Sequence, residues 1–116
     1  MAKDSAKTRT SPQMLFDSAT ELLFSRGLDY GHYEDNLNRI SIAVSAYLGI
    51  EVKPSQIANI MVLVKVMRSV ESPRKLDNYV DAIAYLGMVP DLIQFEDGVY
   101  EDYINARIEE DLDGDL

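Results

Sequence analysis

Apolar residues recur every three or four positions along most of the chain, the spacing of one helix face. Residues 11–27 read as a first helix, because Ser11 suits the N-cap, Pro12 suits the first helical position and Gly27 suits the end. Residues 34–49 read as a second helix that starts with two acids and closes at a glycine. Its apolar face holds four residues: Leu37, Ile40, Val44 and Leu48.

Two further helices follow at proline-marked starts. Residues 54–70 begin with Pro54 and are apolar around nearly the whole circumference, so this third helix is expected to be the buried centre of the fold. Its β-branched runs also suit a strand, but the segment is too long for a typical one. Ser72 and Pro73 predict the start of a fourth helix that ends at Gly87, with one apolar stripe: Leu76, Tyr79, Ile83 and Leu86.

The two ends of the chain differ from this body. Residues 1–10 are small and polar and read as a flexible arm. Residues 91–116 alternate acids with apolar residues, which predicts one or two short acidic helices docked on the body and a frayed end. The sequence therefore predicts an all-α fold: a compact bundle of four main helices at 11–90 with a buried central helix, followed by a partly docked acidic segment.

The net charge of −9 is concentrated at one end of the chain. Residues 1–90 hold ten acids and ten Lys or Arg residues, which sum to zero, whereas residues 91–116 hold ten acids and Arg107 alone. Neutralising nucleic-acid phosphates requires clustered cations, so direct nucleic-acid binding is not expected. The acidic segment favours a basic protein partner, or serves solubility only.

The absence of cysteine excludes disulfides and thiolate metal sites and suits a reducing compartment. The longest apolar run, "IMVLV" at residues 60–64, is far shorter than the roughly 20 residues that cross a bilayer, and the first ten residues do not resemble a signal peptide. We therefore expect a cytoplasmic protein without membrane contact. No cofactor is indicated.

One charged constellation stands out at the junction of the third and fourth helices. Lys65 and Arg68 share a helix face, and Asp77, Asp81 and Tyr85 follow one another at intervals of four on the next helix, bordered by Asn78. Helices joined by so short a link run antiparallel, so the two polar strips are expected to lie near each other. Three interpretations remain open: ordinary solvated faces, an ion network that fixes helix register, or a ligand site.

The segment from residue 30 to residue 87 resembles a family of small, mostly uncharacterised proteins encoded by phages and prophages. The resemblance covers about half of the chain and rests on the order and spacing of several short pieces: Tyr30-Gly31, Asp35-Asn36, Arg39-Ile40, Leu48-Gly49, Pro54, Met61 with Lys65 and Arg68, and "DNYVDAIAY". It implies an α-helical phage protein, located in the cytoplasm of the host cell, and says little about activity.

"DNYVDAIAYL" is also similar to the second half of the all-α nucleotide pyrophosphatases of the MazG type. Asp81 matches that family's Asp, but Asn78 stands at its Glu position. In the first half of the motif, Val64, Lys65 and Arg68 replace three acids that hold Mg²⁺ in the family. Cations repel a hard cation that needs oxygen ligands, so the resemblance implies a divergent or metal-free relative. Lys and Arg would still suit phosphate oxygens.

The remaining candidates carry little chemistry. His32 is the only histidine, which excludes a multi-histidine metal site within one chain, and it is expected to be exposed in the loop after the first helix. Glu34 and Asp35 are better explained as charges at a helix N-terminus than as metal ligands. The aspartates at 111, 113 and 115 lack the Glu of an EF-hand loop and read as solvated. No catalytic residue and no metal ligand is assigned.

Two functions remain. The first is a non-enzymatic interaction protein of phage origin, which self-associates through leftover apolar surface and binds a host or phage protein through its acidic segment. The alternative is a nucleotide-binding or nucleotide-metabolising protein, in which Lys65 and Arg68 hold phosphate while Asp77 and Asp81 orient a base, sugar or cation. A decoy for DNA-binding proteins fits less well, since the charge is confined to one end.

Overall fold

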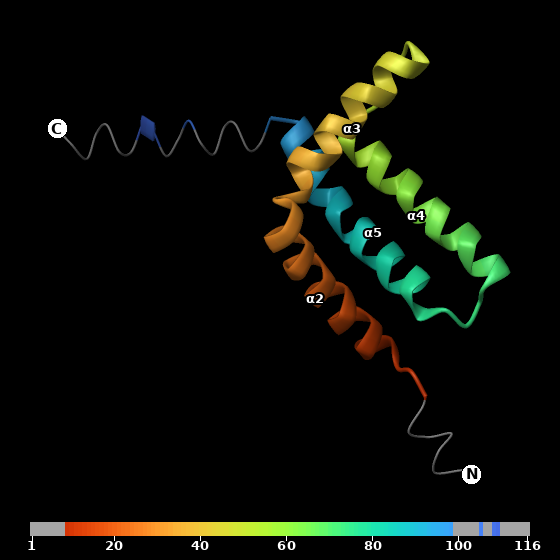
Figure 1. Cartoon of the computed structure of the whole chain (residues 1–116). Coiled ribbons are helices and arrows are strands. Elements are labelled where there is room, and N and C mark those ends of the chain that lie inside the picture. The colour runs from red at the N-terminus through yellow and green to blue at the C-terminus, as the bar shows by residue number, and fades with distance from the viewer. Residues whose placement is uncertain (1–8, 99–104, 106–107, 110–116) are drawn as a thin grey trace, which may run out of the picture.

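A computed structural model of the chain describes residues 9–98, 105 and 108–109. Its body consists of four α-helices: α2 (Pro12–Tyr30), α3 (Tyr33–Leu48), α4 (Pro54–Glu71) and α5 (Leu76–Glu96) (Figure 1). Within these described residues there is no strand, so the all-α prediction, including the helical interpretation of the third segment, is confirmed. Residues 1–8 of the arm expected at 1–10, and most of the acidic segment beyond residue 98, lie outside the described residues.

The middle position in the fold belongs to α5. Figure 1 shows α5 between α2 and α4, while α3 crosses the end of the bundle where α2 finishes and α4 begins. The expectation that residues 54–70 form the buried centre was wrong. α4 is buried only in its first turns, whereas Leu63 and Met67 are more than 60% exposed. One apolar face of α4 remains uncovered, because α2 packs on α5, on the far side of the hairpin.

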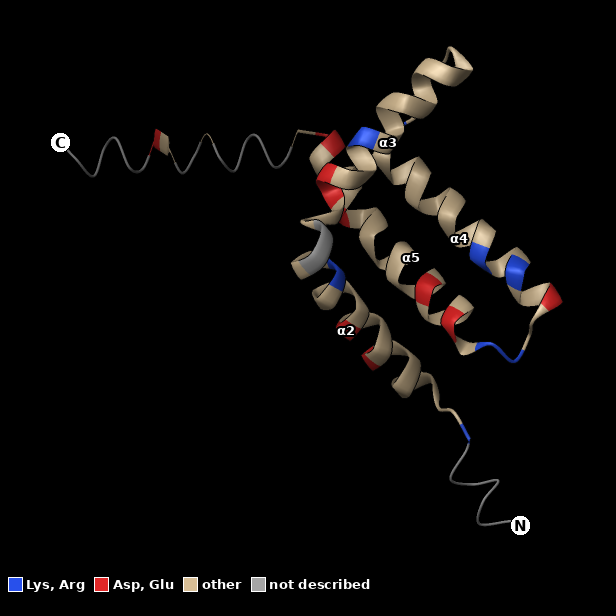
Figure 2. Ribbon diagram, viewed as in Figure 1, with Lys and Arg blue, Asp and Glu red and all other residues tan. Residues whose placement is uncertain are grey.

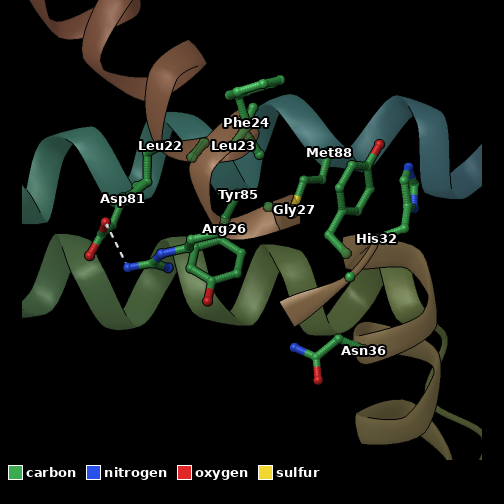
Figure 3. A pocket seen from close by; sticks show the side chains of 13 residues that line it. Leu22, Leu23, Phe24, Arg26, Gly27, His32, Asn36, Asp81, Tyr85 and Met88 are labelled. Atoms are coloured by element: carbon green, nitrogen blue, oxygen red, sulfur yellow. Dashed lines mark ion pairs between the residues drawn. The ribbon is translucent and has the colours of Figure 1, made fainter. Parts of the chain in front are cut away.

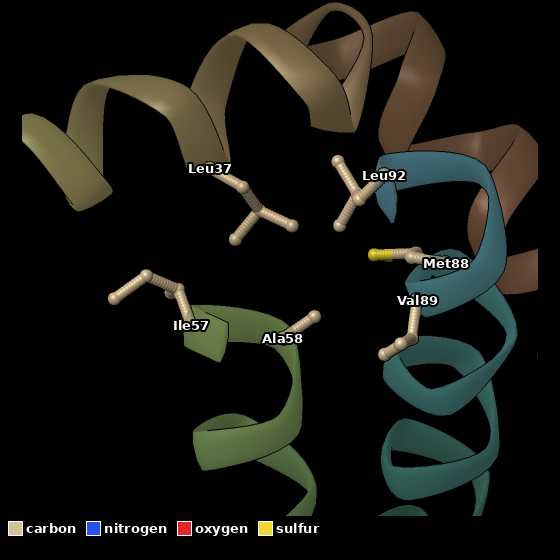
Figure 4. Packing of buried hydrophobic residues seen from close by; sticks show 6 residues of the cluster. All are labelled: Leu37, Ile57, Ala58, Met88, Val89 and Leu92. Atoms are coloured by element: carbon tan, nitrogen blue, oxygen red, sulfur yellow. The ribbon is translucent and has the colours of Figure 1, made fainter. Parts of the chain in front are cut away.

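The hydrophobic core lies where α3, α4 and α5 meet (Figure 4). Leu92 of α5 is completely buried, and five further residues complete the cluster: Leu37, Ile57, Ala58, Met88 and Val89. Half-buried side chains pack around it, among them Leu23 of α2 and Tyr85 of α5. This small core ties the three helices together at one end of the bundle and leaves the far end of the α4–α5 hairpin to be held by other contacts.

Local signals fixed several helix ends. The Ser11 side chain accepts a hydrogen bond from the Met14 amide at 3.3 Å, as expected of an N-cap before a first-position proline. Gly49 closes α3 with a φ of 72°, a left-handed conformation that glycine adopts without a Cβ penalty. Gly27, by contrast, does not end α2. The helix continues to Tyr30 and closes at Gly31, whose φ is 78°.

The fourth helix differs most from its prediction. Residues 72–75 form the turn of the hairpin, so α5 starts at Leu76, and it runs through Gly87 and Pro90 to Glu96. The proposed boundary at residue 90 therefore falls inside a helix. Pro90 removes one backbone hydrogen bond. We attribute the continuation to what the last two turns contribute: Leu92 enters the core, and the Glu96 carboxylate accepts two hydrogen bonds of 2.7 Å from the Ser55 amide and hydroxyl.

Candidate functional site

An ion pair joins Lys65 of α4 to Asp81 of α5. Lys65 Nζ lies 3.0 Å from Asp81 Oδ2, and both side chains are only 13% exposed. Arg26 of α2 approaches the other carboxylate oxygen, with 3.8 Å between Arg26 Nη2 and Asp81 Oδ1. We call Arg26, Lys65 and Asp81 the Asp81 junction. Each of the three side chains comes from a different helix, so the junction connects α2, α4 and α5. None of the three residues belongs to the hydrophobic core.

The other members of the predicted strips do not join this junction. Figure 2 shows the cations in the second half of α4 and the acids in the first half of α5 at the same end of the hairpin. Arg68 and Asp77 are nevertheless exposed, and neither forms an ion pair within the described part of the chain. The antiparallel register explains this result. Because the helices run in opposite directions, Arg68, three residues after Lys65, is opposed by the residue three positions before Asp81. That residue is Asn78, which carries no charge.

Asn78 and Tyr85 are integrated into the body rather than presented to solvent. Asn78 is buried at 7% exposure, one turn before Asp81. Tyr85, one turn after Asp81, packs against the hydrophobic core and lines a cavity. Of the six predicted candidates, therefore, the structure pairs Lys65 with Asp81 and leaves Arg68 and Asp77 outside the junction. Asn78 and Tyr85 lie one turn before and one turn after Asp81 on α5.

A cavity of about 650 Å³ opens between α2, the start of α3 and α5 (Figure 3). This volume is within the usual range for small-molecule sites. The walls are mostly apolar, and Arg26 and Asp81 lie at one end while His32 lies at the other; Asn36, Tyr33 and Tyr85 add polar atoms. The guanidinium and carboxylate offset each other's charge. The lining therefore resembles a site for a small neutral or flat molecule more than one for a highly charged phosphate chain.

Arg26 was not among the candidates predicted from the sequence, which placed Lys65 and Arg68 opposite Asp77 and Asp81. Arg26 occurs near the end of α2, and Asp81 lies far along the chain on α5. No short-range spacing connects the two residues. The only available signal was that Arg26 interrupts the apolar pattern close to the expected helix end, which did not distinguish it from a solvated cation.

A second polar cluster lies at the rim of this cavity. One ligand-capable atom each from His32, Glu34 and Asp91 lies within 4.8 Å of the others. His32 Nδ1 accepts a hydrogen bond of 3.2 Å from the Glu34 amide and so caps α3. The expectations that His32 is exposed between two helices and that Glu34 lies in a first helical turn are confirmed. The contribution of Asp91, far along the chain on α5, was not foreseen.

Tyr33 contacts two members of this cluster, Asp91 and His32. Its hydroxyl donates a hydrogen bond to Asp91 Oδ2, and its ring stacks on that of His32 with 4.4 Å between centroids. Burial raises the pKa of the Tyr33 phenol above its ordinary value, and the hydrogen bond and negative charge of Asp91, followed by the charge of Glu34, add to this effect. Tyr33 is therefore held as a neutral hydrogen-bond donor.

Residues 14–93 match the protein family described as Domain of unknown function (DUF6378). This range includes most of the four helices, the Asp81 junction and the cluster of His32, Glu34 and Asp91. The chain belongs to this family. It is also similar to the Gene 55 protein of Mycobacterium phage D29, with 30% identity over 78 residues, covering 66% of this chain and 52% of the relative.

The Gene 55 protein of Mycobacterium phage L5 is 34% identical over 76 residues, covering 65% of this chain and 49% of the relative. The chain thus spans about half the length of these curated relatives. Comparison with solved structures gave no significant match. The resemblance to an uncharacterised phage family is confirmed by these findings. In addition, none of the helices in the described residues is long and apolar enough to span a bilayer.

Proposed function

We propose that this phage-family protein is a non-enzymatic interaction protein that pairs with a second copy of itself. The observation that supports the proposal most strongly is the uncovered face of α4. Four apolar residues, which we call the α4 stripe, are between 46% and 69% exposed: Ile60, Leu63, Met67 and Val70. Their spacing of three, four and three residues is that of the a and d positions of a coiled-coil seam.

The charge distribution on α4 favours the same interpretation. From residue 54 to residue 67 the only charged residue is Lys65, and its ammonium group is engaged by Asp81 on the covered side of the helix. An exposed helix normally carries charges on its outer face. A second copy is the occupant we propose, because a two-fold axis beside α4 would bring two identical, uncharged stripes together without placing a charge in the contact.

Light scattering coupled to size-exclusion chromatography tests this pairing over a range of protein concentrations. We expect a mass near twice the 13.1 kDa of one chain at high concentration. The double substitution Leu63→Glu and Met67→Glu should restore the monomer, because desolvating a charge in an apolar contact is costly. Ile42→Glu is the matched control, since Ile42 is 62% exposed on α3, away from the stripe.

A monomer at every concentration would refute the pairing. Equal disruption by Ile42→Glu would refute the assignment to α4. Circular dichroism of each variant confirms that the helices are retained, so that a loss of pairing is not mistaken for unfolding.

We further propose that the acidic C-terminal segment binds a basic host or phage protein, since ten acids and a single arginine occur in the last 26 residues. A truncation that tests this must start after Gly98. Removing residues from 91 onward would also remove Leu92 from the core and Glu96 from Ser55. We expect truncation after Gly98 to abolish capture of a defined partner from host lysate without changing helix content. Retention of that partner by the truncated chain would refute the proposal.

A second candidate function, nucleotide binding or metabolism of the MazG type, is favoured by one observation: the cavity opens directly beside Asp81 and Tyr85. Arg26, rather than Arg68, is the cation in its wall. Because Lys65 is engaged by Asp81, the cavity offers few charges for a triphosphate, and a nucleoside should bind as well as its triphosphate. Thermal unfolding with nucleosides and nucleotides, with and without Mg²⁺, tests this function.

At a ligand concentration a hundredfold above Kd, binding should stabilise the protein by about 2.7 kcal/mol. Arg26→Gln should reduce the shift, whereas Arg68→Gln, which changes an exposed arginine outside the cavity, should not. The absence of any shift with all nucleosides and nucleotides would exclude this candidate.

A further inference from the structure

We propose that His32, Glu34 and Asp91 form a binding site for a borderline divalent transition-metal ion of the Zn²⁺ class. This site goes beyond both functions proposed above and does not depend on either. One ligand-capable atom from each residue lies within 4.8 Å of the other two. The three residues come from separate parts of the fold: the link between α2 and α3, the first turn of α3, and the last third of α5.

The donor set determines the class of ion. One imidazole nitrogen with two carboxylate oxygens suits Zn²⁺ and its neighbours, whereas Mg²⁺ and Ca²⁺ prefer oxygen ligands only. Three protein ligands also leave at least one coordination position for water or an exogenous molecule. Because His32 also lines the cavity, the proposed site borders the cavity.

The distances require only a small contraction. Two ligand atoms on a tetrahedral zinc ion lie roughly 3.4 Å apart, given bond lengths of about 2.0–2.2 Å. His32 Nδ1 and Glu34 Oε2 are 3.9 Å apart, and the whole cluster spans no more than 4.8 Å. His32 and Asp91 are exposed and Glu34 is half-buried, so rotations of these side chains can close the remaining distance without displacing a core residue.

Tyr33 holds the cluster in place before an ion arrives. Its hydroxyl donates to Asp91 Oδ2 and so restricts the carboxylate, whose other oxygen remains available as a ligand. Stacking of the Tyr33 and His32 rings restricts the imidazole in the same way. Supporting contacts of this kind orient metal ligands and raise affinity. An ion that takes Nδ1 would replace the hydrogen bond from the Glu34 amide, whereas one that takes Nε2 would leave the cap intact.

Two conservative substitutions remove the ligands and retain their structural contacts. In His32→Asn the new side chain is itself a preferred N-cap, and in Asp91→Asn the amide oxygen can still accept the Tyr33 hydrogen bond. Asp35→Asn is the matched control, because Asp35 lies in the same first turn of α3 but outside the cluster. All variants are made in the full chain, so that the acidic segment is present in each.

The test is titration with Zn²⁺ by isothermal calorimetry, with the visible absorption of Co²⁺ as a report on coordination. We expect one saturable site per chain, a rise in Tm on Zn²⁺ addition, and d–d bands from bound Co²⁺. His32→Asn and Asp91→Asn should each weaken this site more than tenfold, and Asp35→Asn should leave it unchanged. Weak binding shared equally by all four proteins, or no saturable site at all, would overturn the proposal.

Discussion

The Lys65–Asp81 pair offers the sharpest test of how the hairpin is held together. Replacing Lys65 with Met leaves Asp81 with Arg26 as a second cation at 3.8 Å. Replacing Asp81 with Leu leaves Lys65 without a carboxylate among the described residues. The two single substitutions should therefore differ in their effect, and the loss of the acid should be the more damaging.

Removing one partner from a fully buried pair costs roughly 3–5 kcal/mol. Here both side chains retain 13% exposure, and the long lysine stem can carry its ammonium toward water, so the free energy of unfolding should fall less. We expect a loss of about 2 kcal/mol for Asp81→Leu and about 1 kcal/mol for Lys65→Met. The double variant buries no unpaired charge and should lose only about 1 kcal/mol in total, which gives a coupling energy of about 2 kcal/mol.

Urea denaturation followed by circular dichroism measures these values, at one low protein concentration so that self-association does not alter the result. Arg68→Met is the matched control, since it exchanges the same types of residue one turn away. Arg68 is exposed and has no ion pair in the described residues, so its replacement should cost less than about 0.5 kcal/mol. If the two single effects add within about 0.3 kcal/mol, the pair does not stabilise the hairpin and the reasoning fails.

Three further predictions concern the rest of the fold. Leu92→Ala should destabilise by about 3 kcal/mol in urea denaturation, because Leu92 is completely buried; a loss below about 1 kcal/mol would contradict its central position. Glu96→Gln should cost about 1–2 kcal/mol through weaker hydrogen bonds to Ser55, and the same value in a Ser55→Ala background would contradict that contact. Because the pKa of Tyr33 is raised, its contribution to stability is complete below the ordinary tyrosine value of about 10 and is lost as pH rises beyond it. Tyr33→Phe should therefore reduce the loss of stability between pH 9 and 11, as urea midpoints would show, and an unchanged alkaline loss would contradict it.

The helix starts at Pro12 and Pro54 and the left-handed end at Gly49 follow from the sequence. Each depends on contacts between residues no more than four positions apart, which a local pattern encodes directly. The fold class follows for the same reason, because the apolar period is repeated in every segment. The approach of the two polar strips that carry Lys65 and Asp81 could also be expected, since a short turn fixes the direction of the two helices, but the specific pair could not.

Local patterns were insufficient where packing competed with propensity. Gly27, Gly87 and Pro90 each favour the end of a helix, but each is inside one. A glycine costs about 1 kcal/mol within a helix and a proline about 3 kcal/mol. In α5, burying Leu92 and joining Glu96 to Ser55 can offset the costs of Gly87 and Pro90, but neither contact is visible until the helices are assembled.

The sequence by itself determined the all-α class, most helix starts, and the presence of an acidic segment after a charge-balanced body. Only the tertiary structure decided that α5 occupies the middle, that Arg26 rather than Arg68 approaches Asp81, and that His32 and Glu34 meet Asp91. The physical reason is distance along the chain. Tyr33 and Asp91 are separated by 58 positions, yet they share a hydrogen bond, and such a contact depends on how whole helices pack rather than on any periodicity within them.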